Sequence, residues 1–591
     1  MLAPTDHRRR FQLVLIKPSH YDDDGYVIQW MRSSIPANSL ACVYTLARDA
    51  AERSVLGADV DIDIIAIDET NTRVKTDKFI DLMKRHDGFG MVGLVGVQSN
   101  QFPRAMDIAR RFRQADVPVV IGGFHVSGLL AMLSETPKDI QEALDIGCSL
   151  FAGEAEGRFD EVLRDAAALT LKPIYNYVDD LPSLEAAPTP YLPRDTLGRV
   201  YNSHASFDAG RGCPFQCSFC TIINVQGRKS RRRTPDDVEQ LIRHHWADGI
   251  RRFFITDDNF ARNKDWEPIF DRIIQLREVD KIDVRLIIQV DTLCHKLPNF
   301  IEKARRAGVT RVFIGLENIN PTNLMAAKKR QNKITEYRKM LLGWKHAGVI
   351  TYAGYILGFP GDTPQSIRED IEIIKRELPL DILEFFCLTP LPGSEDHKVL
   401  WQKGVWMDPD MNKYDLEHVT TVHPKMSIED WHAIYREAWN AYYTPEHKMT
   451  IMRRAAATGM GMSRLMAVLF AFSVALPVEN LHPLQFGAFR LKYRRDRRPG
   501  YPIEPALVFY PKLAWEIAVK HWRLARDWLE IIRMRRRALR EQMVEPYMDL
   551  ALTPVSDDET ETLAMFTHND GARDQIAHIR KVDRLTHAAP V

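Results

Sequence analysis

Alternating strand-like and helix-like segments between residues 205 and 392 constrain the fold of this chain more than any other feature. Strands are predicted at 205–212, 252–256, 284–290, 312–316, 351–357 and 382–388, with helices between them. Thr234 followed by Pro235 is typical of a helix start. Because alternating β and α segments of this length form parallel sheets with right-handed crossovers, residues 205–395 are predicted to form an open, partial (β/α)6 barrel.

Three cysteines directly follow the first predicted strand, in Gly-Arg-Gly-Cys-Pro-Phe-Gln-Cys-Ser-Phe-Cys. Cys213, Cys217 and Cys220 have the spacing C-x3-C-x2-C. Three thiolates leave a cubane iron–sulfur cluster one ligand short, so that one iron is open to a small molecule. Structural zinc is the alternative, but it needs a fourth ligand, and no nearby histidine has a finger-like spacing. A disulfide framework is disfavoured, since the 591 residues hold only seven cysteines and no secretory signal.

Polar residues and glycines follow the predicted barrel strands where those strands end. Asp258, Gln289, Glu317 and Gly358 follow the second to the fifth strand. Each of them alone is compatible with an ordinary loop. Active groups of parallel barrels collect at the carboxyl ends of the strands. Because these residues and the cysteines all follow strand ends, they are predicted to line one ligand cleft.

At the cysteine motif the chain resembles the radical S-adenosylmethionine (SAM) enzymes, whose motif is C-x3-C-x-φ-C with an aromatic residue at φ. Phe219 fills that place. The resemblance implies that the three cysteines hold a [4Fe–4S] cluster whose open iron chelates SAM, and that an external donor of flavodoxin or ferredoxin type reduces it. It also implies a set of SAM-binding residues. These are Phe219, Asp258, Gln289, Glu317 and Gly358.

Residues 11–170 are predicted to form a separate, doubly wound (flavodoxin-like) parallel sheet. Strands are predicted at 12–16, 61–67, 91–97, 117–121 and 148–151, and helices at 40–52, 79–84 and 103–114. Near-continuous apolar strands indicate burial on both faces. Such sheets bind ligands at the carboxyl ends of their strands. No G-x-G-x-x-G follows the first strand, so a dinucleotide is poorly supported.

Two glycine-containing pieces, residues 119–125 and 152–157, look like parts of the cobalamin-binding domains that accompany radical SAM barrels. The D-x-H-x-x-G motif that supplies a histidine to cobalt is missing, and His20 has a different spacing, so we expect no histidine below the corrin. A domain that keeps this fold without the cofactor is the alternative. The resemblance implies a set of cobalamin contacts. These are Val97, Gln98, Ser99, Gly122, Gly123, Gly153 and Glu154.

The rest of the chain is divided by composition. Residues 171–204 are a proline-rich, semi-rigid linker, 396–550 a mainly helical domain and 551–591 a polar tail predicted to be disordered. Residues 490–540 hold fifteen Lys and Arg against five Asp and Glu, with tryptophans interleaved. The favoured interpretation of this basic segment is a helix face exposed to water. The second is peripheral membrane contact through residues 465–540. Nucleic-acid binding is disfavoured because no recognition module is present. Residues 465–478 are too short to span a bilayer. We therefore expect a cytoplasmic protein, or alternatively one that is peripherally bound to the inner face of the membrane.

Together the resemblances predict a cobalamin-dependent radical SAM enzyme, a methyltransferase acting on an unactivated carbon of a small-molecule or lipid-like substrate. One SAM would methylate the cobalamin; another would yield the 5′-deoxyadenosyl radical, which removes a hydrogen atom so that the substrate takes methyl from methylcobalamin. One alternative keeps both cofactors for oxidation, cyclisation or rearrangement. Another is a non-catalytic cluster- or corrin-binding protein. A methylthiotransferase would need more N-terminal cysteines than Cys42 and Cys148.

Overall fold

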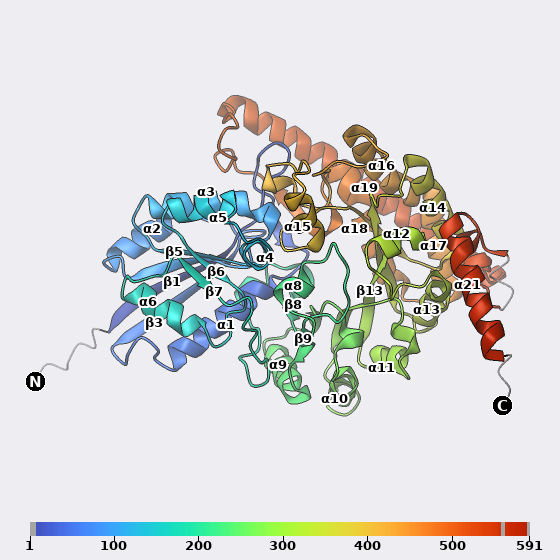
Figure 1. The fold of residues 1–591 in the computed structure, drawn as a ribbon, viewed down its shortest axis with the longest axis horizontal. Coiled ribbons are helices and arrows are strands. Elements are labelled where there is room, and N and C mark those ends of the chain that lie inside the picture. The colour runs from blue at the N-terminus through green and yellow to red at the C-terminus, as the bar shows by residue number, and fades with distance from the viewer. Residues whose placement is uncertain (1–7, 557–561, 588–591) are drawn as a thin grey trace, which may run out of the picture.

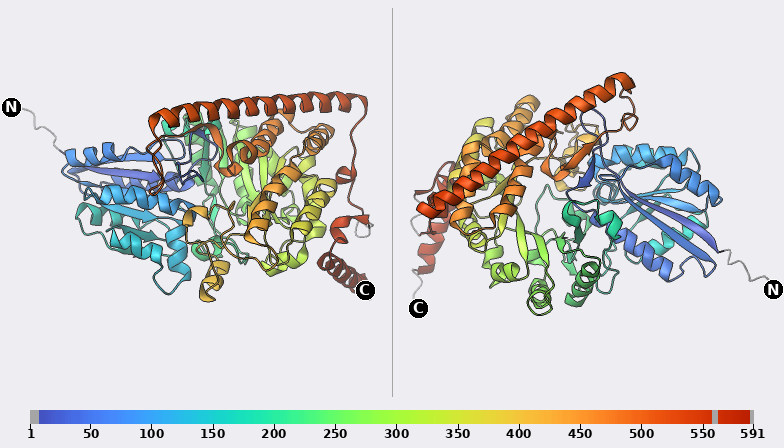
Figure 2. Two further views of the ribbon diagram at one scale, coloured as in Figure 1. Left: turned by 90° about the horizontal axis from the view of Figure 1, so that it is seen from above. Right: turned by 180° about the vertical axis from the view of Figure 1, so that it is seen from behind.

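The computed structural model describes residues 8–556 and 562–587. A sheet with helices on both faces forms one end of the molecule, and an open barrel forms the middle (Figure 1). C-terminal helices cover the barrel, and one long helix, α19 (Ala506–Val544), runs along an edge of the molecule (Figure 2). The predicted fold class is confirmed.

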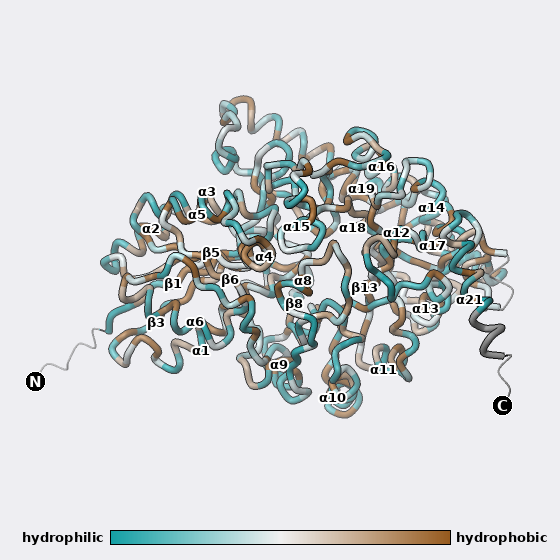
Figure 3. Tube along the Cα trace, in the orientation of Figure 1, coloured by the Kyte–Doolittle hydropathy of each residue, from teal (hydrophilic) through white to brown (hydrophobic). Residues whose placement is uncertain are grey.

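The N-terminal sheet has six parallel strands in the order β3-β1-β4-β5-β6-β7. Alternate residues of β1 enter different cores: Leu13 and Leu15 join one cluster, while Val14 and Ile16 join another. The strands are therefore buried on both faces, and Figure 3 shows apolar residues on β5 and β6 inside this part. The strands are β1 (Arg9–Lys17), β3 (Val60–Asp68), β4 (Gly90–Leu94), β5 (Val119–Gly122), β6 (Ser149–Ala152) and β7 (Ile174–Asn176). The helices are α1 (Asn38–Glu52), α2 (Thr76–Arg85), α3 (Phe102–Arg113), α4 (Phe124–Met132), α5 (Lys138–Asp145) and α6 (Phe159–Ala167).

The sixth strand, β7, was not predicted and lies within residues 171–204, which the sequence indicates as linker. It is only three residues long and pairs in parallel with β6. Its brevity and the prolines around it conceal the strand in the sequence.

The barrel is a second sheet of six parallel strands in chain order, as predicted. In the described part of the chain its edge strands β8 and β15 do not pair, so the barrel is open. Its strands are β8 (His204–Phe207), β11 (Arg252–Ile255), β12 (Arg285–Val290), β13 (Val309–Glu317), β14 (Ile350–Leu357) and β15 (Ile382–Cys387). Its main helices are α9 (Pro235–Ala247), α10 (Trp266–Glu278), α11 (Phe300–Arg306), α12 (Pro321–Ala326), α13 (Ile334–His346) and α14 (Pro364–Glu377).

The first predicted barrel strand, 205–212, is divided in the structure. After β8 the chain leaves the barrel sheet, and β9 (Gly210–Arg211) pairs antiparallel with β10 (Arg231–Arg232). The Asp257 carboxylate accepts from Ala209 N at 2.7 Å and Gly210 N at 2.8 Å. These bonds replace ladder bonds and turn the chain toward the cysteines.

The C-terminal helices cover the outside of the last two barrel strands. Ser427 Oγ accepts from Asp430 N at 3.0 Å and caps α16. Trp431 and Trp439 on this helix are buried. A small antiparallel sheet of β2 (Gln29–Ser33) and β16 (Gly487–Leu491) joins this region to the N-terminal part. The helices are α15 (Glu395–Gln402), α16 (Ile428–Tyr442), α17 (Pro445–Ala457) and α18 (Met462–Val474), with α19.

Within the described residues, one helical stretch, Met462–Glu479, is long and apolar enough to cross a membrane. It begins with α18, and the Phe470 and Trp528 rings pack with centroids 5.1 Å apart where α18 meets α19. Core helices of soluble proteins also meet this criterion, and 44% of the stretch is buried inside the protein.

The predicted disordered tail is wrong for residues 551–556 and 562–587. Ala551 and Leu552 are buried in a 3₁₀ turn (Leu550–Leu552). A 3₁₀ turn (Ala564–Phe566) leads to α21 (Asp570–His587), and Met565 and Phe566 are buried. The Glu377 carboxylate accepts from Ala564 N at 3.0 Å and Met565 N at 2.9 Å. A short apolar cluster within a polar segment anchors this part to the barrel. The remainder of that prediction, residues 557–561 and 588–591, lies outside the described residues.

Candidate active site

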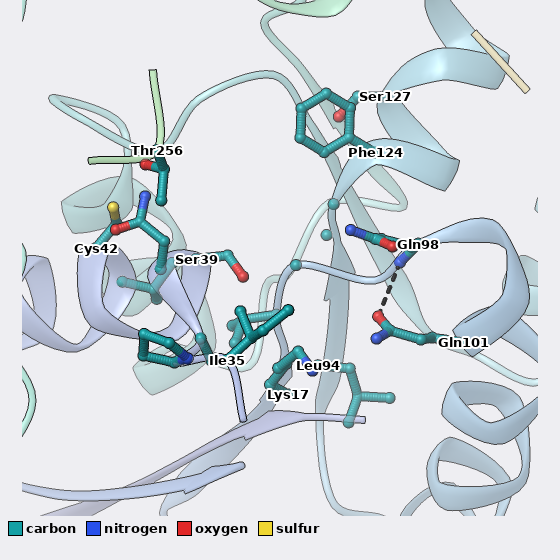
Figure 4. Close-up of a pocket in the computed structure, with 18 of the residues that line it drawn as sticks. Lys17, Ile35, Ser39, Cys42, Leu94, Gln98, Gln101, Phe124, Ser127 and Thr256 are labelled. Atoms are coloured by element: carbon teal, nitrogen blue, oxygen red, sulfur yellow. Dashed lines mark hydrogen bonds between the residues drawn. The ribbon is translucent and has the colours of Figure 1, made fainter. Parts of the chain in front are cut away.

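A cavity of about 630 Å³ lies where the carboxyl ends of the N-terminal strands face the barrel. Figure 4 shows residues from both parts around it. Lys17 and Leu94 come from the ends of β1 and β4, Ser127 from α4, and Thr256 from the end of β11. The volume lies within the range of ligand sites, roughly 300–1,000 Å³.

The cavity wall combines apolar residues with amide and hydroxyl groups. Ser39, Gln98 and Ser127 are among the polar side chains (Figure 4). Gln98 N donates to Gln101 Oε1 at 3.1 Å, which fixes the loop after β4. Asn38 also lines the cavity, and its buried Oδ1 accepts no hydrogen bond from the described residues. Since buried polar atoms are nearly always paired, this oxygen is available to a ligand that carries N–H groups.

The predicted corrin contacts divide into two groups. Gln98, Gly122, Gly123, Gly153 and Glu154 line the cavity. Val97 and Ser99 are buried and are not part of its wall.

Val97 and Ser99 have structural contacts behind the cavity. The Ser99 hydroxyl lies 3.2 Å from His125 Nδ1. Gly123 has φ +146°, and a Cβ there would lie 2.2 Å from Val97 N. Glycine is therefore required at 123 for the close approach of two backbone segments.

Glu154 is held by the barrel rather than free at the cavity wall. Its carboxylate pairs with Arg211 (Nη1 to Oε2, 2.6 Å) and with Arg231. Arg211 also pairs with Glu156 at 2.6 Å and with Asp208 at 3.0 Å. We call these five residues the arginine clamp; it joins the N-terminal part to the strand that precedes the cysteines. Sequence reasoning missed Arg211 and Arg231, because a salt bridge between distant segments has no local pattern.

The loop with Cys213, Cys217 and Cys220 follows β9, and all three thiols are free of disulfides. Its backbone is fixed from two sides. Cys213 N donates to Gly227 O at 3.2 Å, and Ser218 N donates to Ala327 O at 3.1 Å. The next element, α8 (Ile222–Val225), contributes to the cavity wall. The loop therefore lies next to the cavity although none of its thiols lines it.

The chemistry of these thiols suits a metal cluster. Burial raises the pKa of Cys213 to about 11 and that of Cys220 to about 12. Only a nearby cation would make them thiolates at neutral pH, and iron ions supply that charge. Among the described residues no three His, Cys, Asp or Glu side chains are placed to hold one metal ion. A cubane does not require such convergence, because each thiolate binds a different iron.

Two predicted SAM contacts, Phe219 and Glu317, meet around a third residue. Lys329 Nζ pairs with Glu317 and lies 5.8 Å from the Phe219 ring centroid. Two residues further on, Gln331 Nε2 donates to Cys217 Sγ at 3.5 Å. Sequence reasoning missed Lys329, which follows α12 in a segment without a recognised motif.

Asp258 is the one predicted SAM contact that lines the cavity. Burial, helped by the neighbouring Asp257 carboxylate, raises the pKa of Asp258 to about 7. Gln289 Nε2 donates to Asp257 O at 3.3 Å, which connects β12 to the end of β11. Gly358 has φ +104°, and a Cβ there would lie 1.9 Å from Trp431 Cζ2. Glycine at 358 is therefore required by the packing of α16 against β14, and Asp258 is the candidate that can touch a ligand in the cavity.

Residues 209–374 match the family described as the Radical SAM superfamily. The chain therefore contains a radical SAM domain. The matched range contains the cysteine loop and the predicted SAM contacts, so the recognition made from the sequence is confirmed. The chain is therefore a radical SAM enzyme.

Several curated relatives of this radical SAM enzyme are methyltransferases. It is 26% identical over 355 residues to bacteriochlorophyllide d C-8(2)-methyltransferase of Chlorobaculum tepidum. The aligned region covers 56% of this chain and 73% of that relative. It is 26% identical over 318 residues to hopanoid C-2 methylase of Rhodopseudomonas palustris. The aligned region covers 52% of this chain and 58% of that relative. The chain thus spans little more than half the length of the second relative.

Solved structures share the fold of the enzyme. The cobalamin-dependent S-adenosylmethionine radical enzyme OxsB, with aqua-cobalamin and S-adenosylmethionine bound, covers 97% of this chain and 84% of its own, with a TM-score of 0.52 and 11% identity. TsrM from Kitasatospora setae, a radical S-adenosylmethionine methyltransferase with cobalamin and a [4Fe–4S] cluster bound, covers 73% of this chain and 88% of its own, with a TM-score of 0.50 and 15% identity. The likeness establishes the architecture.

Proposed function

We propose that this radical SAM enzyme is a cobalamin-dependent methyltransferase that acts on an unactivated carbon. One observation carries the proposal: the segment after the cysteine loop and the glycine-rich strand ends of the N-terminal sheet border one cavity. The curated methyltransferase relatives and the cobalamin-bound structures of the same architecture support it.

The proposal assigns three cofactors to named residues. Cys213, Cys217 and Cys220 would hold a [4Fe–4S] cluster, which supplies the electron for SAM cleavage. SAM would lie on the barrel side, near Asp258 and the remaining predicted contacts. Cobalamin would lie against the N-terminal strand ends, where Asn38 Oδ1 and Gln98 offer partners for its amides; it supplies a cobalt centre that carries methyl.

The chain itself positions these groups and excludes water from them. The arginine clamp fixes the strand before the cysteines against the N-terminal part. In α8, which follows the cysteine loop, Asn224 Nδ2 donates to Gly393 O at 2.9 Å. A radical intermediate requires such a closed and fixed space, because water and misorientation would divert it.

We further propose a lipid-like substrate. The cavity wall that the C-terminal region completes has an apolar part formed by Ile28, Trp30, Leu484 and Phe486, next to the polar side chains of Asp415, His482 and Gln485. One curated relative is named for a hopanoid and another for a bacteriochlorophyllide. The proposal includes an external flavodoxin- or ferredoxin-type electron donor and peripheral contact with the inner face of the membrane through residues 465–540.

The test is purification under anaerobic conditions from cells supplied with cobalamin, followed by iron, sulfide and corrin analysis. We expect about four irons per chain and one corrin per chain. With SAM and dithionite the protein should form 5′-deoxyadenosine. Cys217→Ala should lose most of the iron and the 5′-deoxyadenosine while keeping the corrin. Cys294→Ala, at a buried cysteine outside the loop, is the matched control and should retain all three.

The outcomes separate the alternatives. Iron without corrin would reject the cobalamin assignment. Both cofactors with no 5′-deoxyadenosine would favour a non-catalytic scaffold. When a substrate is found, a product without added methyl and without S-adenosylhomocysteine would reject methyl transfer in favour of oxidation, cyclisation or rearrangement.

A further inference from the structure

The outward face of α19 carries a row of exposed apolar residues at seven-residue spacing. Val508, Trp515, Trp522 and Leu529 have exposed fractions of 53%, 73%, 65% and 51%. Residues seven apart on an α-helix are offset by only about 20° around the axis. These four residues therefore form one continuous stripe, although two of them are tryptophans, which are normally buried to a large extent.

The same face becomes basic in the second half of the helix. Arg533, Arg536 and Arg540 are exposed and fall in the same sector as the tryptophans, by helix geometry. In the described part of the chain, none of these three forms an ion pair with a carboxylate, whereas Lys520 on another face pairs with Glu479 at 2.7 Å. The stripe is thus apolar in its first half and cationic in its second. We call residues 508–540 of this face the α19 stripe.

The opposite face of α19 fixes the helix to the protein. Phe509, Ile531 and Ala538 are its buried residues, and Trp528 packs on Phe470 of α18. Arg453 on α17 pairs with Glu541 at 2.8 Å. The α19 stripe is held outward by these contacts, along the edge of the molecule that Figure 2 shows from above.

We propose that the α19 stripe docks on the surface of an anionic lipid bilayer. Tryptophan side chains prefer the interface between headgroups and acyl chains, and arginines bind lipid phosphates in a bidentate manner. A helix that only faced water would gain nothing from exposed tryptophans. The proposal narrows the contact expected from the sequence, since α18 lies under α19 and does not belong to the stripe.

The α19 stripe also lies near the apolar wall of the cavity. Phe489 on β16 is 54% exposed and stacks on His521 of α19, with ring centroids 5.6 Å apart. The residues just before β16, Leu484 and Phe486, line the cavity. A bilayer at the α19 stripe would therefore be close to that wall. Docking on the bilayer does not depend on the proposed reaction, and its test measures vesicle binding without measuring enzyme activity.

The test is co-sedimentation of the full-length protein with large vesicles of phosphatidylcholine alone or with 30 mol% phosphatidylglycerol. We expect binding to the anionic vesicles, weakened by raised salt. Each arginine near an anionic surface contributes roughly fivefold in affinity, so Arg533→Glu/Arg536→Glu should lower it by at least 25-fold. Trp515→Ala/Trp522→Ala should lower it about as strongly on anionic vesicles.

Matched variants lie on other surfaces of the molecule. Lys84→Glu/Arg85→Glu on α2 makes the same change of charge, and Trp401→Ala removes another exposed tryptophan. Both should bind vesicles like the unchanged protein. Failure of the unchanged protein to bind anionic vesicles at low salt would overturn the proposal, and so would equal losses in the α2 variant. A dimer in solution that Trp515→Ala/Trp522→Ala dissociates, without vesicle binding, would assign the stripe to a second copy of the chain instead.

Discussion

Replacing Arg211 by methionine should weaken the attachment of the N-terminal part to the barrel. Arg211 is buried and pairs with three buried carboxylates, at 2.6 Å from Glu154, 2.6 Å from Glu156 and 3.0 Å from Asp208. Without the guanidinium, Arg231 still pairs with Glu154. Glu156 loses its one ion pair in the described part of the chain.

The expected cost follows from that uncompensated carboxylate. Removing one partner of a buried ion pair costs about 3–5 kcal/mol. At roughly 1.4 kcal/mol per factor of ten, this raises the population of the separated state by about two to three and a half orders of magnitude. Burial alone would raise the pKa of Glu156, and Arg211 at present holds it below its usual value. In the variant the pKa must rise, so the loss should be largest at pH 8 and should shrink as the pH falls and Glu156 is protonated.

Tryptic cleavage within residues 171–204 reports the separation, because the clamp region also holds this segment. Arg231 donates to Pro182 O at 2.9 Å, and Arg233 to Ala187 O at 3.0 Å. When opening is fast relative to cleavage, the cleavage rate follows the open population. Arg211→Met should accelerate cleavage at pH 8 by the factor given above, and the added change Glu156→Gln should restore part of the protection.

The control is Arg53→Met, which removes an exposed pair with Asp160 inside the N-terminal part and should change cleavage little. If Arg211→Met accelerates cleavage no more than the control, or if Glu156→Gln worsens it further, the clamp does not hold the two parts together.

Three further changes test the barrel, the C-terminal region and the tail. Gly358→Ala should lower the free energy of unfolding by at least about 2 kcal/mol in urea denaturation, because its Cβ would overlap Trp431. Burial would lower the pKa of His418, but hydrogen bonds to Asp415 and a second aspartate raise it to about 11. The stabilisation of the fold by protonated His418 is therefore full below pH 6.5 and is lost as the pH rises toward 11. In thermal scans His418→Gln should remove this decline in stability between pH 7 and 10. Glu377→Gln should speed amide hydrogen exchange at residues 564–566 while leaving the barrel strands unchanged.

Both parallel sheets could be predicted from the sequence, because their strands are apolar runs that alternate with amphipathic helices. What the sequence did not indicate depends on contacts between distant segments. Asp257 divides the first barrel strand through bonds to Gly210, 47 residues away. Strand β2 pairs with β16, more than 450 residues further along the chain. Met565 and Phe566 are buried only because the barrel offers a matching surface.

The candidate site shows the same division. The cysteine loop is a local pattern, and its place beside the cavity follows from the topology of a parallel barrel. Glu154 and Gly358 were also predicted from local patterns, namely an acid or a glycine at the end of a predicted strand. Their contacts, with Arg211 and Trp431, come from other parts of the chain. Sequence reasoning therefore located these positions without indicating that protein groups, rather than a cofactor, contact them in the structure.

The cavity is bounded by two separate attachments of the N-terminal part. The arginine clamp lies on the side of the cysteines, and His418, 3.2 Å from Asp23, lies with the β2–β16 sheet on the side of the C-terminal region. Two attachments on different sides of a cavity resist a simple hinge motion, because opening about one of them breaks the other. Between the two attachments, residues 34–39, at the start of α1, and residues 484–486 complete the cavity wall. Residues 484–486 lead directly into β16, whose Phe489 stacks on His521 of α19. With the proposed docking of the α19 stripe on a bilayer, a lipid-like substrate would approach the cavity at this wall.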